Sequence, residues 1–286
     1  RLVSDWSSDV CSSDLLSKEE INSWNGPKYY ISHLAVQNPK STSTPVRIVF
    51  NSSQTFRGTS LNACLAKGPE SYLNDLLGIL LLWREERVAL VADIKKMYNS
   101  IFINEIEQHT HHFLWRGLEQ RDPDVYIILR VNMGDRPAAA ISSEAIYKTA
   151  DLFHKEYPRV AKLLKGSTYV DDIVDSFPSH SSAMETARGT NTVLQNAGFK
   201  VKCWLFSGEP DKRIELEDQP TAAEPKPTQV LGVHWNSSSD IITFSTNLNF
   251  STKKKGVYTK ADLTETEFTK QMPEVDRKST RLNSSH

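Results

Sequence analysis

The chain of 286 residues lacks the features that mark secreted or membrane proteins. It has only 3 cysteines and no Cys-x-x-Cys pair, which argues against a disulfide framework or a zinc site. The longest apolar run, LLGILLLW at 76–83, is too short to cross a bilayer, and no basic segment leads into an apolar one near the start. The formal net charge of −1 neither indicates nor excludes a nucleic-acid partner. We therefore expect an intracellular protein without a membrane segment.

Both ends of the chain lack a helical or strand period. Residues 4–15 and 277–286 are poor in apolar side chains, and each resembles translated sequencing-adapter sequence. We therefore expect residues 1–15 to be an artefactual or disordered tail, and we expect the same of the last part of 251–286. Neither tail is expected to contribute to the fold.

Apolar residues between these ends alternate between strand and helix periods. Residues 87–94 form a continuous β-branched and apolar run, which is typical of a strand buried on both faces, and residues 199–206 are also expected to form a strand. Residues 138–158 and 181–198 have helical composition and boundaries. Interleaved helices, strands and hairpins predict an α+β fold, with helices on one face of an antiparallel sheet. Further strands are expected within 26–53, 124–132, 167–177 and 230–244.

One expected helix, within 71–86, has apolar residues on a single helical stripe. Ser71 is a suitable N-cap for this helix. The pattern predicts core packing for Leu73, Leu76, Leu77, Leu80 and Trp83.

Three histidines, His109, His111 and His112, lie close together along the chain. No cysteine or further histidine stands nearby at the spacing of a zinc site, so we expect a polar surface patch.

Two adjacent aspartates, Asp171 and Asp172, stand in the β-prone stretch STYVDDIVDSF at 167–177. Burying two like charges is costly unless a cation lies against them. A third carboxylate, Asp93, stands at the end of the expected buried strand in VALVADIKKMY. A strand-end aspartate and a hairpin-tip pair can converge on two divalent ions, and Mg²⁺ prefers such oxygen ligands. The alternative from the residues alone is a solvated β-turn, in which aspartate is common.

The sequence YVDD (169–172), together with ADIKKMY (92–98), resembles the catalytic core of reverse transcriptases. The stretches VRIVFNSS, SLNACLAKGPE, VALVADIKKMY, HHFLWRG and LGVHW occur in order and resemble the BEL/Pao family of LTR retrotransposons. The resemblance covers about residues 28–250 and implies a fragment of a right-hand polymerase. Its implied parts are fingers at 28–90 with 110–135 contributing, a palm with a primer-grip hairpin at 88–250, and a linker in 251–286 towards a missing thumb.

The resemblance also implies roles for individual residues. Asp93, Asp171 and Asp172 match carboxylates that hold two Mg²⁺ ions, with Mn²⁺ as an alternative. Tyr98 matches an aromatic steric gate, whose ring would clash with a ribose 2′-hydroxyl and so favour deoxynucleotides. Arg47 matches a fingers arginine that pairs with the incoming triphosphate, a task suited to a permanently charged bidentate donor.

Further implied positions complete the expected site. Gly134 in MGDRP and Tyr169 in YVDD belong to the nucleotide-binding set, and Leu231 with Gly232 in LGVHW matches the primer grip. Lys202 in FKVKCW matches a lysine that donates a proton to departing pyrophosphate, and Lys200 competes for that role.

The implied reaction is attack of a primer 3′-hydroxyl on a dNTP, templated by RNA or DNA, in the cytoplasm or a virus-like particle. Protease, RNase H and integrase domains are expected in the intact element. Two alternatives remain open at this point. The first alternative is a catalytically inactive remnant, at most a nucleic-acid-binding module. The second is an RNA-dependent RNA polymerase, whose palm uses the same arrangement of carboxylates.

Overall fold

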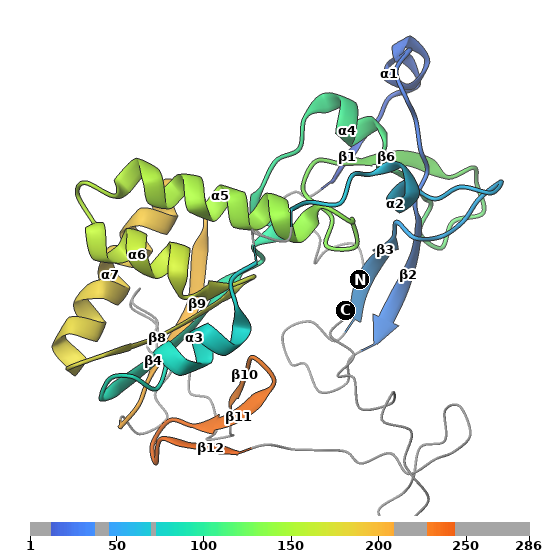
Figure 1. The fold of residues 1–286 in the computed structure, drawn as a ribbon. Helices are drawn as coiled ribbons and strands as arrows, with labels where there is room; N and C mark the ends of the chain where they lie inside the picture. The colour runs from blue at the N-terminus through green and yellow to red at the C-terminus, as the bar shows by residue number, and fades with distance from the viewer. Residues whose placement is uncertain (1–12, 38–45, 70–72, 209–227, 244–286) are drawn as a thin grey trace, which may run out of the picture. The chain divides into compact units, whose positions relative to one another are not determined.

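The computed structural model describes residues 13–37, 46–69, 73–208 and 228–243, which form an α+β fold with antiparallel sheets (Figure 1). The strands are β1 (Ser13–Leu15), β2 (Ser32–Gln37), β3 (Val46–Asn51), β4 (Val88–Lys95), β5 (His112–Trp115), β6 (Asp124–Ile128), β7 (Thr168–Tyr169), β8 (Asp172–Phe177), β9 (Lys200–Phe206), β10 (Thr228–Val230), β11 (Val233–Asn236) and β12 (Ile241–Thr243). The helices are α1 (Lys18–Ser23), α2 (Leu61–Cys64), α3 (Leu76–Leu82), α4 (Glu105–His109), α5 (Ala138–Phe153), α6 (Pro158–Gly166) and α7 (His180–Asn196), with a short 3-10 helix, η3, at Tyr98–Ser100.

The central sheet has four strands in the order β7-β8-β4-β9. Strand β4 is interior, and its side chains are buried on both faces along most of its length, as its continuous apolar run predicts. Because successive strand side chains point to opposite faces, Val88 and Leu90 join one core cluster, whereas Ala89 and Val91 join another.

The first face of this sheet is covered by the three longest helices, α5, α6 and α7 (Figure 1). Each helix contributes an apolar stripe to the first cluster, including Ile146 from α5, Leu163 from α6 and Ala187 from α7. Helix α7 ends where the sequence predicts, because Gly198 just beyond it adopts a left-handed φ of 81°.

The second face is covered by α3 and by the small sheet β10-β11-β12. Trp83 at the end of α3 and Trp235 on β11 meet edge to face, with ring centroids 5.1 Å apart, and both are fully buried. The turn before β12 is fixed by Asp240, whose Oδ1 accepts hydrogen bonds from Trp235 Nε1 at 2.9 Å and from Arg84 at 2.7 Å. The predicted α+β class is therefore confirmed, and the long helices do lie on one face.

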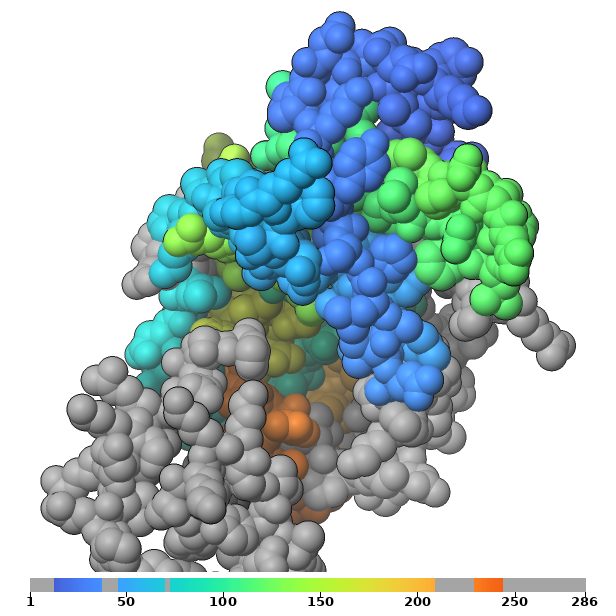
Figure 2. Space-filling model, turned by 90° about the vertical axis from the view of Figure 1, so that its right-hand side faces the viewer, coloured from blue at the N-terminus to red at the C-terminus, as the bar shows by residue number. Residues whose placement is uncertain are grey.

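A two-stranded ribbon, β2-β3, and a three-stranded sheet, β1-β6-β5, lie outside the central sheet in pairing. One face of the ribbon packs on β5, where Phe50 and Phe113 have ring centroids 4.9 Å apart and His33 contacts both rings. On the other face, Leu34 and Val49 are cross-strand partners and are 49% and 42% exposed. The ribbon lies at the surface in the space-filling view (Figure 2).

The prediction that residues 1–15 do not contribute to the fold is wrong for the last three of them. Strand β1 pairs antiparallel with β6, from Ser13 opposite Ile128 to Leu15 opposite Tyr126, and Ser13 is buried. The reason is that β6 would otherwise expose an unpaired edge, which a short extended segment satisfies through its backbone whatever its side chains are. Residues 1–12 and 277–286 lie outside the described residues.

The expected core stripe of the helix within 71–86 is confirmed for Leu80 and Trp83 but is wrong for Leu73, Leu76 and Leu77, which are exposed. Helix α3 begins at Leu76, and its N-cap is Asp75, whose carboxylate accepts from the backbone N–H groups of Leu77 and Gly78. Ile79 and Trp83 face the core, whereas Leu77 is 64% exposed. Ser71 lies outside the described residues. Among the helices of the described part of the chain, none combines the length and the apolar character needed to cross a bilayer.

Candidate active site

Asp93 is carried to the end of the central sheet by the buried strand β4. The β4–β9 pairing is irregular at this point, because Ala92 pairs with Trp204 but Ile94 pairs with Val201. Two residues of β9, Lys202 and its neighbour, therefore oppose Asp93, which is the arrangement of a β-bulge. Bulges re-aim side chains next to active sites, and this one leaves the half-buried Asp93 near the exposed Lys202.

Asp171 and Asp172 are placed by the hairpin β7–β8. Tyr169 pairs with Asp172, so the turn consists of Val170 and Asp171 alone. Val170 has a φ of 55°, a left-handed value that is strained for a β-branched residue. The turn is anchored on β4, because the Ile94 N–H donates to the Asp171 carbonyl at 2.8 Å.

The three carboxylates come near one another because β4 and β8 pair in register. Asp93 is the direct partner of Asp172, and such antiparallel partners have Cα atoms about 4.5–5.5 Å apart. One step along the same face, Val91 is the partner of Val174, and both belong to the second core cluster. Asp93 and Asp172 therefore point to the face that α3 and the β10–β11 hairpin cover, with Asp171 in the adjoining turn.

The electrostatics of this cluster indicate uncompensated negative charge. Burial, followed by the charges of Asp171 and Asp93, raises the pKa of Asp172 to about 7. Burial and the charge of Asp93 also raise the pKa of Asp171. A neighbouring cation would reverse both shifts, because it stabilises the charged form of each carboxylate.

The donor set fits a hard divalent cation. All three groups offer carboxylate oxygens, which Mg²⁺ and Mn²⁺ prefer, without histidine or thiolate. Within the described residues, no group of three or more His, Cys, Asp or Glu side chains lies close enough together to hold a metal ion as it stands. Like charges without a counter-ion repel one another, so an open arrangement is the expected one for these carboxylates.

Two tyrosines border the carboxylates. Tyr98 begins the 3-10 helix that follows β4, and burial together with the nearby charge of Asp171 raises its pKa. Tyr169 is half-buried and packs against the second core cluster. Tyr98 and Tyr169 therefore both lie near the carboxylates, and their contacts with a nucleotide stay predictions.

The expected primer-grip residues form the tip of the β10–β11 hairpin. Val230 pairs with Val233, so the turn consists of Leu231 and Gly232, whose φ values are 46° and 89°. Two successive left-handed residues are typical of a type I′ turn. Leu231 packs against the same cluster as Tyr169, so this hairpin and the carboxylate hairpin share one support.

Arg47 and Gly134 lie elsewhere. Arg47 is exposed on β3 of the two-stranded ribbon, a different sheet from that of the carboxylates, so the structure does not bring it into their cluster. Gly134 lies against β3, where an added Cβ would come within 2.9 Å of the Phe50 carbonyl oxygen. Glycine is therefore needed for packing within the protein, and its role towards a nucleotide stays a prediction.

The expected surface patch of histidines is wrong, because His109, His111 and His112 are all buried. His109 stacks on Trp24 with ring centroids 3.9 Å apart, and its Nδ1 lies 3.0 Å from His112 Nε2. His111 instead contacts Asp135 beside Gly134, a link that sequence reasoning missed. The signal was present in the apolar FLW that directly follows the histidines, since it continues them into a buried strand.

Comparison with known proteins supports the fold. No protein-family model matches the chain, and no curated protein matches it in sequence. Among solved structures, the foamy viral protease-reverse transcriptase in complex with RNA/DNA hybrid is similar, with a TM-score of 0.50 and 15% identity over 80% of this chain and 26% of that chain. The dRH form of that protein in complex with double-stranded DNA has a TM-score of 0.51 and 17% identity over 81% of this chain and 32% of that chain. The chain thus has a reverse transcriptase-like fold and spans about a quarter to a third of these solved chains.

Proposed function

We propose that this chain contains the polymerase core of a reverse transcriptase from a BEL/Pao-type LTR retrotransposon. The observation that carries the proposal is the in-register pairing of Asp93 with Asp172, with Asp171 in the adjoining strained turn. The similarity in fold to the foamy viral protein supports it. The activity is RNA-directed DNA polymerisation, in which a primer 3′-hydroxyl displaces pyrophosphate from a dNTP.

Asp93, Asp171 and Asp172 would hold two Mg²⁺ ions or Mn²⁺ in their place. When bound, such a pair of ions stabilises charge on the attacking and leaving oxygens of phosphoryl transfer. The chain itself contributes position. Tyr98 restricts the space beside the nucleotide sugar, and the Leu231–Gly232 turn supports the primer end. Lys202, which is exposed opposite Asp93, would donate a proton to pyrophosphate.

The partners follow from the same proposal. The two foamy viral structures contain RNA/DNA hybrid and double-stranded DNA, and we infer that this chain binds a primed RNA or DNA template together with a dNTP. The intact element would add protease, RNase H and integrase domains. Division of the chain into fingers at 28–90 with 110–135 and a palm at 88–250 belongs to this proposal.

A primer-extension assay on the full chain tests the activity. We expect incorporation of dNTPs on an RNA template with Mg²⁺ or Mn²⁺, and loss of at least about a thousandfold in Asp171→Asn, because one charge of the site is removed. Asp151→Asn is the matched control, since this exposed carboxylate on α5 pairs only with Lys165 at the surface. It should retain wild-type incorporation.

Two outcomes would contradict the proposal. Equal incorporation by wild type and Asp171→Asn would show that the carboxylates do not carry the reaction. Binding of primed template without extension, even with a polymerase thumb domain appended, would favour the binding-only remnant.

The choice of sugar tests the Tyr98 assignment and separates the proposal from an RNA polymerase. We expect Tyr98→Ala to reduce the preference for dNTP over rNTP by at least about tenfold, about 1.4 kcal/mol, because the ring no longer opposes a 2′-hydroxyl. Tyr98→Phe keeps the ring and should keep the preference. The measurement is the ratio of kcat/KM for the two nucleotides, and an unchanged ratio in Tyr98→Ala would remove Tyr98 from this role.

A further inference from the structure

A buried polar network holds the loop from Asn132 to Pro137, and the proposed reaction does not use it directly. Asn132 donates from Nδ2 to Ser52 Oγ at 2.9 Å and to Asp135 Oδ1 at 2.9 Å. Ser52, directly after β3, donates from Oγ to Asp135 Oδ1 at 2.5 Å. Asp135 therefore joins its own loop to the end of the strand that carries Arg47.

The Asp135 carboxylate is ionised in this setting. Its Oδ1 accepts from Ser52 and Asn132, and its Oδ2 lies 2.8 Å from His111 Nε2. Donors on both oxygens favour the charged form. Since the Asp135 side chain is only 7% exposed, its charge needs a partner, and His111 with 4% exposure lies against it.

The contacts of His111 identify that partner as an imidazolium. Nδ1 lies 2.7 Å from the Glu107 carbonyl oxygen, which can only accept a hydrogen bond. Nδ1 also lies 3.0 Å from Thr110 Oγ1, but this hydroxyl donates its proton to the same carbonyl at 2.7 Å and so can only accept from the ring. Nε2 faces the Asp135 carboxylate, which also accepts. A neutral imidazole carries one N–H and satisfies only one of the two acceptors, whereas the protonated ring satisfies both.

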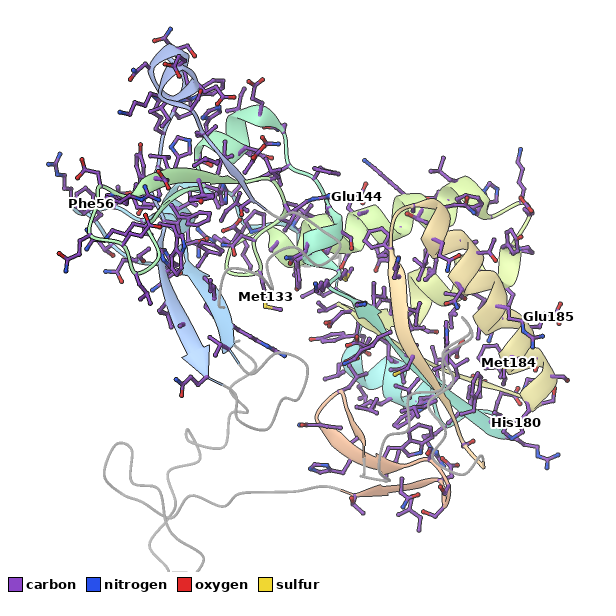
Figure 3. The ribbon with its side chains drawn as sticks, turned by 180° about the vertical axis from the view of Figure 1, so that it is seen from behind. Phe56, Met133, Glu144, His180, Met184 and Glu185 are labelled. Atoms are coloured by element: carbon purple, nitrogen blue, oxygen red, sulfur yellow. The ribbon has the colours of Figure 1, made fainter. Side chains whose placement is uncertain are left out.

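The loop held in this way is positioned closely against β3. Asn62 accepts from the Arg136 N–H at 2.8 Å and donates to the Gly134 carbonyl at 2.9 Å, while Gly134 lies against the Phe50 carbonyl. Met133, between Asn132 and Gly134, remains 71% exposed, and it is labelled in Figure 3. The network thus sets the place of an exposed loop residue relative to the ribbon.

We propose that His111, as an imidazolium, is a positioning residue that holds the 132–137 loop through Asp135 in the conformation needed to bind the incoming nucleotide. This inference rests on the proposed polymerase function. His111 does not touch the nucleotide in this account, and its loss should weaken nucleotide binding more than the chemical step.

The charge of His111 makes the clamp sensitive to pH. Burial lowers the pKa of His111, but the hydrogen bond and charge of Asp135, together with Glu107, outweigh burial and raise it above 6.5. The neighbouring His112 has a pKa of about 4 and is therefore neutral beside it. The stabilisation by His111 is complete below pH 6.5 and is lost as pH rises through its folded pKa. Asp135, whose pKa is lowered, limits the acid side, since its contribution is lost as pH falls through its folded value.

Steady-state primer extension from pH 6 to 9 tests the inference. In wild type, KM for dNTP should rise as pH passes the pKa of His111. His111→Gln keeps one donor but no charge, so we expect KM about tenfold higher at pH 6.5, a loss of about 1.4 kcal/mol, with a flattened pH profile and a smaller change in kcat. His112→Gln is the matched control, because this adjacent buried ring contacts His109 instead of the loop. It should lower the melting temperature but keep the wild-type KM and its profile.

An unchanged KM profile in His111→Gln would overturn the inference. If that variant does not fold, nitrogen-15 NMR on the wild-type chain decides. Protonation of both ring nitrogens of His111 at pH 6.5, with faster amide exchange at Asp135 and Arg136 as the ring titrates, supports the clamp, and a neutral ring at pH 6 overturns it. If NMR shows a protonated His111 but the wild-type chain extends no primer, the polymerase function is refuted and the contact that holds the loop is supported. If the chain extends primers while His111 is neutral, the role of His111 is refuted and the polymerase function is supported.

Discussion

Asp172 lies where its charge is costly, since the half-buried carboxyl stands beside Asp171 and Asp93. Its pKa is raised from 3.8 to about 7, so its stabilising contribution is complete below pH 3.8 and is lost as pH rises through about 7. In a protein free of divalent ions, the ionised site therefore weakens the fold at neutral and alkaline pH. A bound cation would remove this destabilisation, so the stability of the fold should depend on whether the carboxylates hold a cation.

Asp172→Asn should consequently be more stable than wild type at pH 8 without divalent ions. The full shift corresponds to about 4 kcal/mol, which solvent screening at a half-buried site reduces to about 1–2 kcal/mol. The difference should shrink as pH falls through 7 and vanish only below pH 3.8, where the carboxyl is protonated in both the folded and the unfolded chain. Mg²⁺ should stabilise wild type but not the variant. Urea unfolding in EDTA and in Mg²⁺ measures both effects, with Asp151→Asn as the control. A variant that is less stable at pH 8 would contradict the charge crowding.

Single residues differ in how far the sequence alone identifies them. Asp93 and Asp171 could be predicted, because strand-end and hairpin-tip positions follow from local patterns. The contact of His111 with Asp135 could not be predicted, since it joins the segment between α4 and β5 to a distant loop through tertiary packing alone. Polar composition favours the surface, and only the folded chain shows which histidines are enclosed by apolar neighbours.

At the scale of elements, the β7–β8 and β10–β11 hairpins each hold a branched apolar residue in a left-handed conformation, and the turn before β12 holds Asp240 in one. Val170 and Leu231 both occupy the first turn position, with φ values of 55° and 46°. The alternation of apolar and polar residues predicts both hairpins, but it carries no information on the φ of a valine or a leucine. Such strain persists where the surroundings impose it and is typical of functional sites. Here it coincides with the two turns that the proposed reaction uses.

Helix α3 shows why the helical period of its apolar residues did not identify its buried face. Its sequence LLGILLL is apolar all round, so no stripe distinguishes the buried face from the exposed one. The β10–β11 hairpin and the sheet decide the matter by covering Ile79 and Trp83.

Ile79→Ala should therefore destabilise the chain by about 2–4 kcal/mol, because it leaves a cavity in the second core cluster. Leu77→Ala on the same helix should cost less than about 0.5 kcal/mol, since that side chain is mostly in solvent. Urea unfolding followed by far-UV circular dichroism measures both. Equal losses would mean that the helix buries a different face in solution.

At the scale of the whole molecule, the α+β class and the order of α5, α7 and the central strands could be predicted, because they depend on many local patterns that agree, whereas α6 after Pro158 was missed. The pairing of β1 with β6 could not, since three residues of low apolar content carry no strand signal of their own. The sequence also predicts only part of the covering of the central sheet on both faces. The hairpin near 230 is recognisable as a strand pair, but its place on the face opposite α5, α6 and α7 depends on contacts distant in sequence.

Trp235 joins these parts, so its removal tests how the molecule holds together. The fully buried ring packs on Trp83 and donates to Asp240, within the cluster that also supports Tyr169 and Leu231. Trp235→Ala should cost about 3–5 kcal/mol, and it should speed amide exchange in β10 and β11 before it affects β4. Trp235→Phe retains most of the packing and should lose less than half as much stability.

Hydrogen exchange combined with urea unfolding shows whether the second core cluster stabilises the whole central sheet or only the hairpin. If β4 loses protection together with the hairpin, the second cluster stabilises the whole sheet. If Trp235→Ala leaves the unfolding midpoint unchanged, the hairpin is only loosely attached, and the support it gives to the carboxylate hairpin is refuted.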